Sequence, residues 1–183
     1  MRVGIVGYGA VGKTRFHSIV KNTSYKVTAI SENNSIARKD IPKNIDVFKD
    51  YQSLIEQSNV DIVFISLPNK FAANATVLSL KKGLHVFCEK PPAKTLAELK
   101  EVLLVSQQHP DLKLMYGFNH RFHHSVEEAK LIIQENSLGR LINMRGVYGK
   151  SQMISFNQTD WRTRREESGG GILLDQGIHM LDL

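Results

Sequence analysis

Over the first 118 residues, short apolar runs alternate with longer segments in which apolar residues recur every three or four positions. The short runs are typical of buried strands, and the longer segments are typical of helices that cover a sheet. Their alternation predicts a parallel sheet with helical crossovers, and therefore an α/β fold. Strands are expected in five segments: residues 2–6, 26–31, 60–67, 84–88 and 113–117.

The segments between these runs carry helix start and stop signals. One helix is expected beyond Gly12, with Phe16, Ile19 and Val20 on one face, and another after Asp50, whose carboxylate is a good N-cap. A third is expected from about Ala72 to Lys82, ending at Gly83, and a fourth opens at the capping box Thr95-Leu96-Ala97-Glu98. The fourth helix is expected to bury three apolar side chains: Leu99, Val102 and Leu103.

Beyond Arg121 the pattern changes. Ser125 opens a second capping box, and the helix that follows is expected to bury Val126, Ala129, Ile132 and Ile133. A strand is expected at residues 141–148 and a last helix at 174–183. A single strand there has nothing in this chain to pair with, and an unpaired edge is an aggregation liability. We therefore expect that the chain is an incomplete version of a longer protein, or that a partner supplies the rest.

Composition narrows the class of protein. The 183 residues, 42% of them hydrophobic, suffice for one globular domain and part of another. The net charge of +6 is scattered, which fits a solvated basic surface or an anionic cofactor better than nucleic acid. Cys88 is the single cysteine, so no intramolecular disulfide is possible. No signal peptide and no apolar stretch approaching the roughly 18 residues of a membrane span is present. We expect a cytoplasmic protein that binds neither nucleic acid nor membrane.

A glycine-rich turn supplies the first candidate chemistry. It follows the first expected strand, precedes a helix and reads Gly7-Tyr8-Gly9-Ala10-Val11-Gly12. In this context the glycines permit a tight turn and close approach of the backbone to a pyrophosphate, which the helix N-terminus binds. Glu32, at the end of the second strand, is placed to accept a hydrogen bond from a ribose 2′-hydroxyl, which favours NAD. Arg38 lies six residues further on and keeps NADP possible.

Lys90 is the leading candidate for catalysis. It follows a strand at the carboxyl edge of the sheet, where a nicotinamide and its substrate would meet, and Pro91 and Pro92 restrict its backbone. Asp175 and His179 are spaced i, i+4, so on a helix they can hydrogen-bond, either as orienter and general base or as an incidental surface contact.

Two further features are ambiguous. Leu67-Pro68-Asn69 either lines the nicotinamide side of the cofactor or is an ordinary turn. The three histidines at positions 120, 123 and 124 match no zinc spacing, and we expect no metal site.

Together these residues resemble the Gfo/Idh/MocA family of nucleotide-dependent oxidoreductases. The resemblance rests on the glycine-rich turn and on four other segments: Asp61–Asn69, Glu89-Lys90-Pro91, Gly117–Phe122 and Gly169–His179. It implies an N-terminal Rossmann domain over residues 1–119 and the start of an α+β C-terminal domain over 120–183. In the family the outer face of that second domain's sheet makes dimers or tetramers, so a homo-oligomer is expected.

The resemblance also implies site residues and an activity. The catalytic residues would be Lys90, Asp175 and His179. The cofactor NAD, or possibly NADP, would be held by Gly7, Tyr8, Gly9, Ala10, Val11, Gly12, Glu32, Leu67, Pro68, Asn69, Glu89 and Lys90. The substrate would contact Asn119, Arg121, Trp161 and Arg162. The implied reaction is hydride transfer to or from a hydroxyl or ketone carbon of a sugar, cyclitol or sugar nucleotide.

This sequence departs from the family pattern in two ways. Ala72 stands where members often have a histidine, and members run well beyond residue 183. The alternative interpretations are an inactive dinucleotide-binding regulatory protein and a non-functional fragment of such a dehydrogenase.

Overall fold

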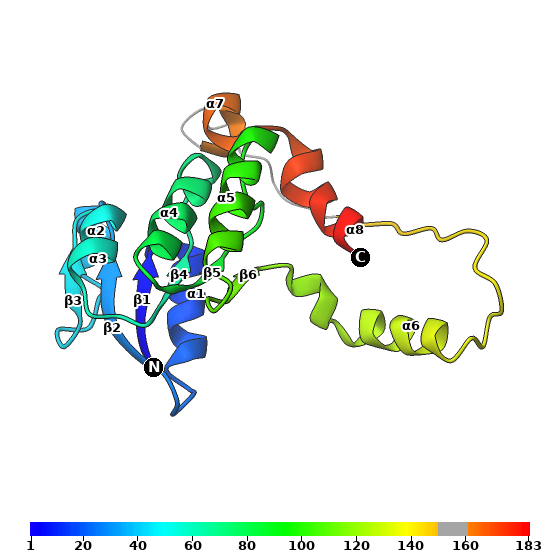
Figure 1. Cartoon of the computed structure of the whole chain (residues 1–183), viewed down its shortest axis with the longest axis horizontal. Coiled ribbons are helices and arrows are strands. Elements are labelled where there is room, and N and C mark those ends of the chain that lie inside the picture. Colours follow the sequence, from blue (N-terminus) through cyan, green and yellow to red (C-terminus); the bar gives the residue numbers. More distant parts are fainter. Residues whose placement is uncertain (150–160) are drawn as a thin grey trace.

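The computed structural model describes residues 1–149 and 161–183 (Figure 1). Their elements follow in the order β1 (Arg2–Val6), α1 (Ala10–Ile19), β2 (Lys26–Ser31), α2 (Ser35–Arg38), β3 (Asp46–Phe48), α3 (Tyr51–Gln57), β4 (Ile62–Ile65), α4 (Asn69–Lys81), β5 (His85–Cys88), α5 (Leu96–Gln108), β6 (Leu114–Tyr116), η1 (Asn119–Phe122), α6 (His124–Gln134), η2 (Trp161–Thr163), α7 (Arg165–Ser168), η3 (Leu173–Gly177) and α8 (Ile178–Asp182).

Six strands form one parallel sheet in the order β3-β2-β1-β4-β5-β6. The chain builds outward from β1 to β3, returns to the centre, and then builds outward to β6 on the other side. The strand order therefore reverses between β1 and β4, the place where open α/β sheets bind ligands. The predicted α/β class is confirmed, and the five expected strands all form. The sixth, β3, was missed because it has three residues and no apolar run of its own.

Two hydrophobic cores lie on opposite faces of the sheet. On one face, Val63 and Ile65 of β4 and Val86 of β5 pack with buried residues of α3, α4 and α5. On the other, Val3 and Ile5 of β1 pack with residues of α1 and β2. Successive residues of a strand point to opposite faces, so each inner strand must be apolar throughout. This explains why the short runs in the sequence are continuous rather than alternating.

Two helix caps form as expected, and two helices begin earlier than the pattern suggested. The Asp50 carboxylate accepts a hydrogen bond from Ser53 N at 2.8 Å, and Thr95 Oγ1 accepts one from Glu98 N at 3.2 Å. α1 starts at Ala10 and α4 at Asn69, each directly after its turn, because the turn itself supplies the first helical residues.

The burial expected for α5 is partly wrong. Val102 is buried, but Leu99 and Leu103 are 37% and 55% exposed, and Val105 is buried instead. Both buried positions lie about one turn apart and belong to the core shared with α4, so the buried stripe of α5 is narrower than expected.

The segment after β6 differs most from expectation. α6 begins at His124 without a side-chain cap, so the capping box at Ser125 does not form, and α6 has no buried residue. Residues 141–149 contain no strand, so the expected strand at 141–148 is wrong. A strand needs a partner for its backbone groups, and the described residues offer none beside it. In Figure 1 α6 and this segment extend away from the sheet.

The last described segment returns to the first domain. α7 contacts α4, and the helical turns η3 and α8 follow it to the end of the chain. The expected helix at 174–183 is thus present, but its first part, Leu173–Gly177, is a π-helix. Within residues 1–149 and 161–183 no helix has the length and apolarity of a membrane span.

Candidate active site

A cavity of about 630 Å³ opens at the carboxyl ends of the central strands. Its walls come from the segments that follow β1, β2, β3, β4 and β5, together with η2 and Asp175 of η3. It is lined by Gly7, Gly9, Ala10, Val11, Ser31, Glu32, Asn33, Asn34, Lys49, Asp50, Tyr51, Gln52, Ser66, Leu67, Pro68, Asn69, Phe71, Glu89, Lys90, Trp161, Arg162 and Asp175. Most residues predicted to bind the cofactor therefore share one cavity at the point where the strand order reverses.

The three glycines of the turn serve different purposes. Gly7 has φ +88°, and a Cβ there would lie 2.6 Å from the Ser66 carbonyl oxygen. A Cβ at Gly12 would overlap the Gly7 carbonyl oxygen, so this residue permits α1 to pack against the turn. A Cβ at Gly9 would meet no protein atom within 4 Å. Glycine at position 9 therefore keeps a space open, whereas Gly7 and Gly12 are required by close contacts within the protein.

That open space lies at the N-terminus of α1. Gly9 is the N-cap and makes no side-chain cap, and the first amides of a helix have no intrahelical acceptors. These amides and the helix dipole favour an anion such as a pyrophosphate. The turn therefore fits a dinucleotide, with Gly9 where the backbone needs to be approached most closely.

Glu32 lies at the end of β2, on the wall of the same cavity. Its carboxylate accepts hydrogen bonds from Tyr8 N at 2.8 Å and from Asn34 N at 2.9 Å. These amides hold the carboxylate where it could accept from a ribose hydroxyl and repel a 2′-phosphate. Arg38 lies in α2, and its guanidinium donates to Asn33 O at 3.4 Å. It does not line the cavity in the described part of the chain.

Lys90 and Asp175 meet across 85 residues of sequence. Lys90 Nζ donates to Asp175 Oδ1 at 2.9 Å and to the Asp175 carbonyl oxygen at 2.5 Å. Burial disfavours the charged carboxylate, but hydrogen bonds from Gln176 and Lys90 outweigh it and hold the pKa of Asp175 below its ordinary value. The two side chains, 17% and 30% exposed, form an ion pair on the cavity wall.

Cys88 and Glu89, which precede Lys90, fix the position of the end of β5. Glu89 Oε1 accepts from Arg15 Nε of α1 at 2.6 Å, which ties β5 to the first helix. Cys88 is fully buried, and burial raises the pKa of its thiol to about 12. The thiol is therefore an unreactive core group, and the ammonium that follows it projects from a fixed strand end.

His179 is a buried residue of α8. It is 4% exposed, and its ring stacks on His120 with centroids 4.0 Å apart and an interplanar angle of 18°. Burial, followed by repulsion from His120 and Lys90, lowers the pKa of His179, so the imidazole is neutral at neutral pH. Its Nδ1 is buried without a hydrogen-bond partner among the described residues. It lines neither of the two cavities described for this chain.

The expected hydrogen bond between Asp175 and His179 does not form. Asp175 instead binds Lys90 and accepts from Gln176 Nε2 at 2.8 Å. The prediction assumed the spacing of an α-helix, in which positions i and i+4 share a face. The spacing rule considers only residues of one helix, and it could not include Lys90, which is 85 residues away and takes the Asp175 carboxylate instead.

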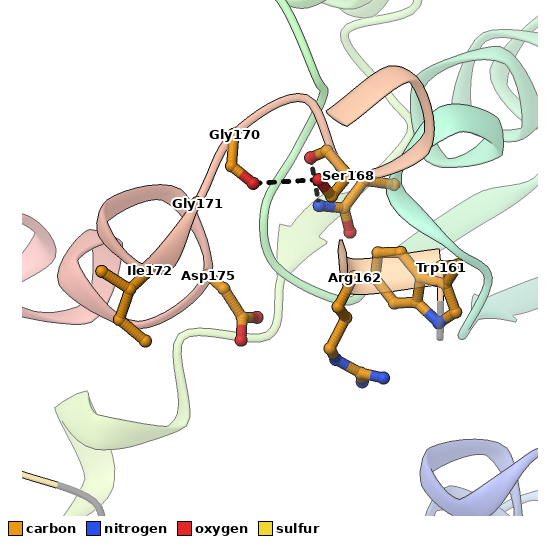
Figure 2. Close-up of a pocket in the computed structure, with 8 residues that line it drawn as sticks. Trp161, Arg162, Ser168, Gly170, Gly171, Ile172 and Asp175 are labelled. Carbon is orange, nitrogen blue, oxygen red and sulfur yellow. Dashed lines mark hydrogen bonds between the residues drawn. The ribbon is translucent and has the colours of Figure 1, made fainter. Parts of the chain in front are cut away.

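Two of the four predicted substrate residues reach the cavities. Trp161 and Arg162 line both the large cavity and an adjoining one of about 160 Å³ beside Asp175 (Figure 2). The Arg162 guanidinium lies 4.5 Å from the centre of the Trp161 ring. Asn119 lies in η1 and lines neither cavity. Arg121 also lies in η1, and its Nε donates to Asp182 Oδ2 at 2.7 Å on the surface.

Several cavity residues were missed by sequence analysis. Asn33 and Asn34 follow Glu32, and Lys49 to Gln52 connect β3 to α3. The second group could have been found only by recognising β3, because its pairing with β2 is what brings the segment to the carboxyl edge. Asp50 was recognised as a cap but not as part of the cavity wall. In the described residues, no group of three potential ligand residues could hold a metal ion.

The parallel sheet, its reversal of strand order and the glycine turn define a dinucleotide-binding α/β protein of the Rossmann type, with the Lys90–Asp175 pair on the wall of its cavity. Comparison with known families places it more narrowly. A family model described as an oxidoreductase family with an NAD-binding Rossmann fold matches residues 1–118, and one described as the GFO/IDH/MocA C-terminal domain matches residues 126–183. The chain belongs to the Gfo/Idh/MocA family of oxidoreductases.

Curated relatives include two dehydrogenases of carbohydrate-like compounds. D-glucoside 3-dehydrogenase of Escherichia coli is 28% identical over 188 residues, covering 100% of this chain and 52% of the relative. Myo-inositol 2-dehydrogenase of Thermotoga maritima is 26% identical over 189 residues, covering 100% and 53%. The chain thus spans about half the length of the curated relatives it matches.

Solved structures show the same similarity. Scyllo-inositol dehydrogenase from Lactobacillus casei, solved with bound NAD(H) and scyllo-inositol, has a TM-score of 0.71 at 30% identity, covering 76% of this chain and 42% of that one. An NAD binding oxidoreductase from Klebsiella pneumoniae has a TM-score of 0.86 at 23% identity, covering 99% and 51%, which supports the fold alone.

Proposed function

We propose that this protein is a dehydrogenase that uses NAD, or less favourably NADP, and acts on a hydroxyl or ketone carbon of a sugar, cyclitol or sugar nucleotide. The observation that carries the proposal is the partly buried Lys90–Asp175 ion pair on the wall of the dinucleotide cavity. Family membership and the names of the relatives support the reaction class. The relatives' named substrates support a small polyol, but not one particular compound.

The residues of the chain divide the chemical work. A bound nicotinamide would supply the acceptor or donor of the hydride. The Lys90 ammonium would hydrogen-bond the substrate oxygen and stabilise the negative charge that develops on it. His179 lines neither cavity in this structure, and the proposal requires its ring to reach the substrate. Neutral at neutral pH, it would take the hydroxyl proton in oxidation and return it in reduction. Asp175 would orient Lys90 and the substrate, and Trp161 and Arg162 would contact the rest of the substrate.

Other assignments remain proposals on the same basis. We propose the division into a Rossmann domain at 1–119 and a second domain at 120–183, and Asn119 and Arg121 as residues near the substrate. We also propose a homo-oligomer in the cytoplasm, a compartment suited to a protein whose single cysteine is a buried thiol.

The test compares Lys90→Ala with the matched control Lys82→Ala, an exposed lysine at the end of α4. With a sugar and cyclitol panel, loss of Lys90 is expected to lower kcat on the order of 10²- to 10³-fold, as for other groups that stabilise an oxyanion. Thermal stabilisation by NADH should persist in both variants. Unchanged turnover in Lys90→Ala would overturn the catalytic assignment. NADH binding by the unaltered chain without turnover on any substrate would favour the regulatory alternative.

A further inference from the structure

A short turn of the C-terminal segment is fastened to the first domain by a buried hydrogen bond. Asn69 Nδ2, in the first turn of α4, donates to the carbonyl oxygen of Ser168 at 2.8 Å. Asn69 and Ser168 are each only 5% exposed. Ser168 Oγ also donates to Gly170 O at 2.9 Å, which stabilises the turn itself. A single side chain of the first domain therefore holds a backbone carbonyl 99 residues away.

Three further contacts surround this bond. Lys70 Nζ lies 3.4 Å from Glu167 Oε2, and Lys94 Nζ donates to Glu166 O at 3.1 Å. Gly169 has φ +81°, and a Cβ there would lie 2.8 Å from both the Lys94 Cα and the Lys94 carbonyl oxygen. The turn at 166–170 thus presses directly on the segment that follows Lys90. Its anchors are the two loops that carry the Pro68-Asn69 and Lys90 motifs.

Asp175 follows this turn closely in the sequence, within a helical segment. Its backbone N donates to Gly171 O at 3.1 Å, so the helical segment that carries it starts directly after the turn. Asn69 lines both cavities, next to Trp161, Arg162 and Asp175. Any shift of the turn would move Asp175 relative to Lys90.

We propose that Asn69 is a positioning residue: its side-chain amide fixes the 166–170 turn and so sets the approach of Asp175 to Lys90. The proposal rests on the function proposed above and adds to it. It also revises the role that the sequence suggested for Asn69, which was contact with the cofactor. One N–H of its amide is committed to the Ser168 carbonyl oxygen.

The sole tryptophan of the chain provides a readout that does not depend on activity. Trp161 precedes α7 and lines both cavities, and its carbonyl oxygen accepts from Arg164 N at 3.2 Å. Release of the turn should therefore expose the indole to solvent. Acrylamide quenching of Trp161 fluorescence can be measured without substrate or cofactor, so it tests the fastening even if the proposed reaction proves wrong.

The experiment uses Asn69→Ala and Asn69→Asp, with exposed Asn44→Ala as control. The aspartate keeps the acceptor oxygen and size but cannot donate to Ser168. Both variants are expected to show increased Trp161 quenching, a kcat lower by about 10- to 100-fold and nearly unchanged NADH affinity, since misplacement of about 1 Å can cost such factors. The control should resemble the unaltered protein.

The opposite pattern overturns the proposal: weaker NADH binding with unchanged kcat and unchanged quenching would make Asn69 a cofactor ligand. If both Asn69 variants fail to fold, the neighbouring ion pair between Lys70 and Glu167 provides the test of the proposal. Lys70→Glu is expected to increase Trp161 quenching, and the double variant Lys70→Glu with Glu167→Lys is expected to restore it. Absence of any effect in Lys70→Glu would contradict the fastening.

Discussion

Replacing Gly9 by alanine should abolish cofactor binding without unfolding the protein. Gly9 has φ −69°, which alanine adopts without strain, and a Cβ would meet no protein atom within 4 Å. The added methyl group would point into the space at the N-terminus of α1 where a pyrophosphate would approach. The intrinsic effects on stability are small and opposed: alanine is a poorer N-cap than glycine, but it reduces the entropy of the unfolded chain, and each effect is below about 1 kcal/mol.

The expected signal follows from binding linkage. NADH at a hundredfold excess over its Kd stabilises the folded state by about 2.7 kcal/mol, which for a chain of this size is a rise in Tm of about 5 to 11 °C. If the methyl group weakens binding about a hundredfold, the same NADH concentration gives only about 0.4 kcal/mol, or about 1 °C. Thermal unfolding with and without NADH therefore separates the two proteins clearly.

Gly83→Ala is the matched control. Gly83 has φ +82° at the end of α4, and a Cβ there would also meet no atom within 4 Å. Alanine should lower Tm through the backbone strain of about 1 to 2 kcal/mol, while the NADH shift remains complete. The reasoning fails if Gly9→Ala retains the full NADH shift, because the glycine turn would then not be where the cofactor binds.

Three other predictions concern the same structure. Gly12→Ala should lower Tm even without NADH, by an overpacking cost of about 1 to 3 kcal/mol, because its methyl would overlap a backbone carbonyl oxygen; an unchanged Tm would contradict this. Hydrogen bonds from Arg2 lower the pKa of Asp61 to about 2 from the ordinary 3.8. The ionised carboxylate therefore stabilises the fold above pH 3.8 and loses this effect as the pH falls through 2. The Tm of Asp61→Asn and that of the unaltered protein should differ at neutral pH and converge between pH 3.8 and 2. Burial and then repulsion from His120 lower the pKa of His179, so the acid limb of the kcat/KM profile should lie below pH 6.5. His120→Phe keeps the stacked ring but removes its charge, and it should move this limb to higher pH. An unmoved limb would exclude an electrostatic effect of His120 on His179.

The first domain could be predicted because its signals are local. A continuous apolar run is sufficient to identify a strand buried on both faces, and Asp50 and Thr95 act within their own helical turn. β3 could not be found in this way, since Asp46-Val47-Phe48 forms a strand only because β2 offers it backbone partners. The segment at 141–148 shows the converse: its composition favours a strand, but no neighbouring strand is available among the described residues.

The candidate site, too, could be predicted only where its signals are local in the sequence. The glycine turn and Glu32 are specified by spacing along the chain, and they line one cavity as expected. The partner of Asp175 was assigned wrongly because the spacing rule considers only neighbours on one helix, while the carboxylate binds Lys90, 85 residues away. The Asn69–Ser168 bond lay beyond sequence reasoning altogether. Nothing in the types of two residues 99 positions apart indicates that an amide and a carbonyl will meet.

The Lys90–Asp175 pair explains why the docking of the last segment matters for chemistry. Each of these two partly buried charges compensates the desolvation of the other. Removing one of them leaves a desolvated charge without a partner, which destabilises the protein. The glycine turn and Glu32, which a dinucleotide would contact, belong to the first domain, whereas Trp161, Arg162 and Asp175 line the same cavity from the C-terminal segment. The ammonium of Lys90, by contrast, is bound by Asp175, whose segment begins directly after the turn that contacts Asn69 and Lys94. We therefore expect cofactor binding and the proposed reaction to be separable, with only the reaction depending on the contact between Asn69 and Ser168.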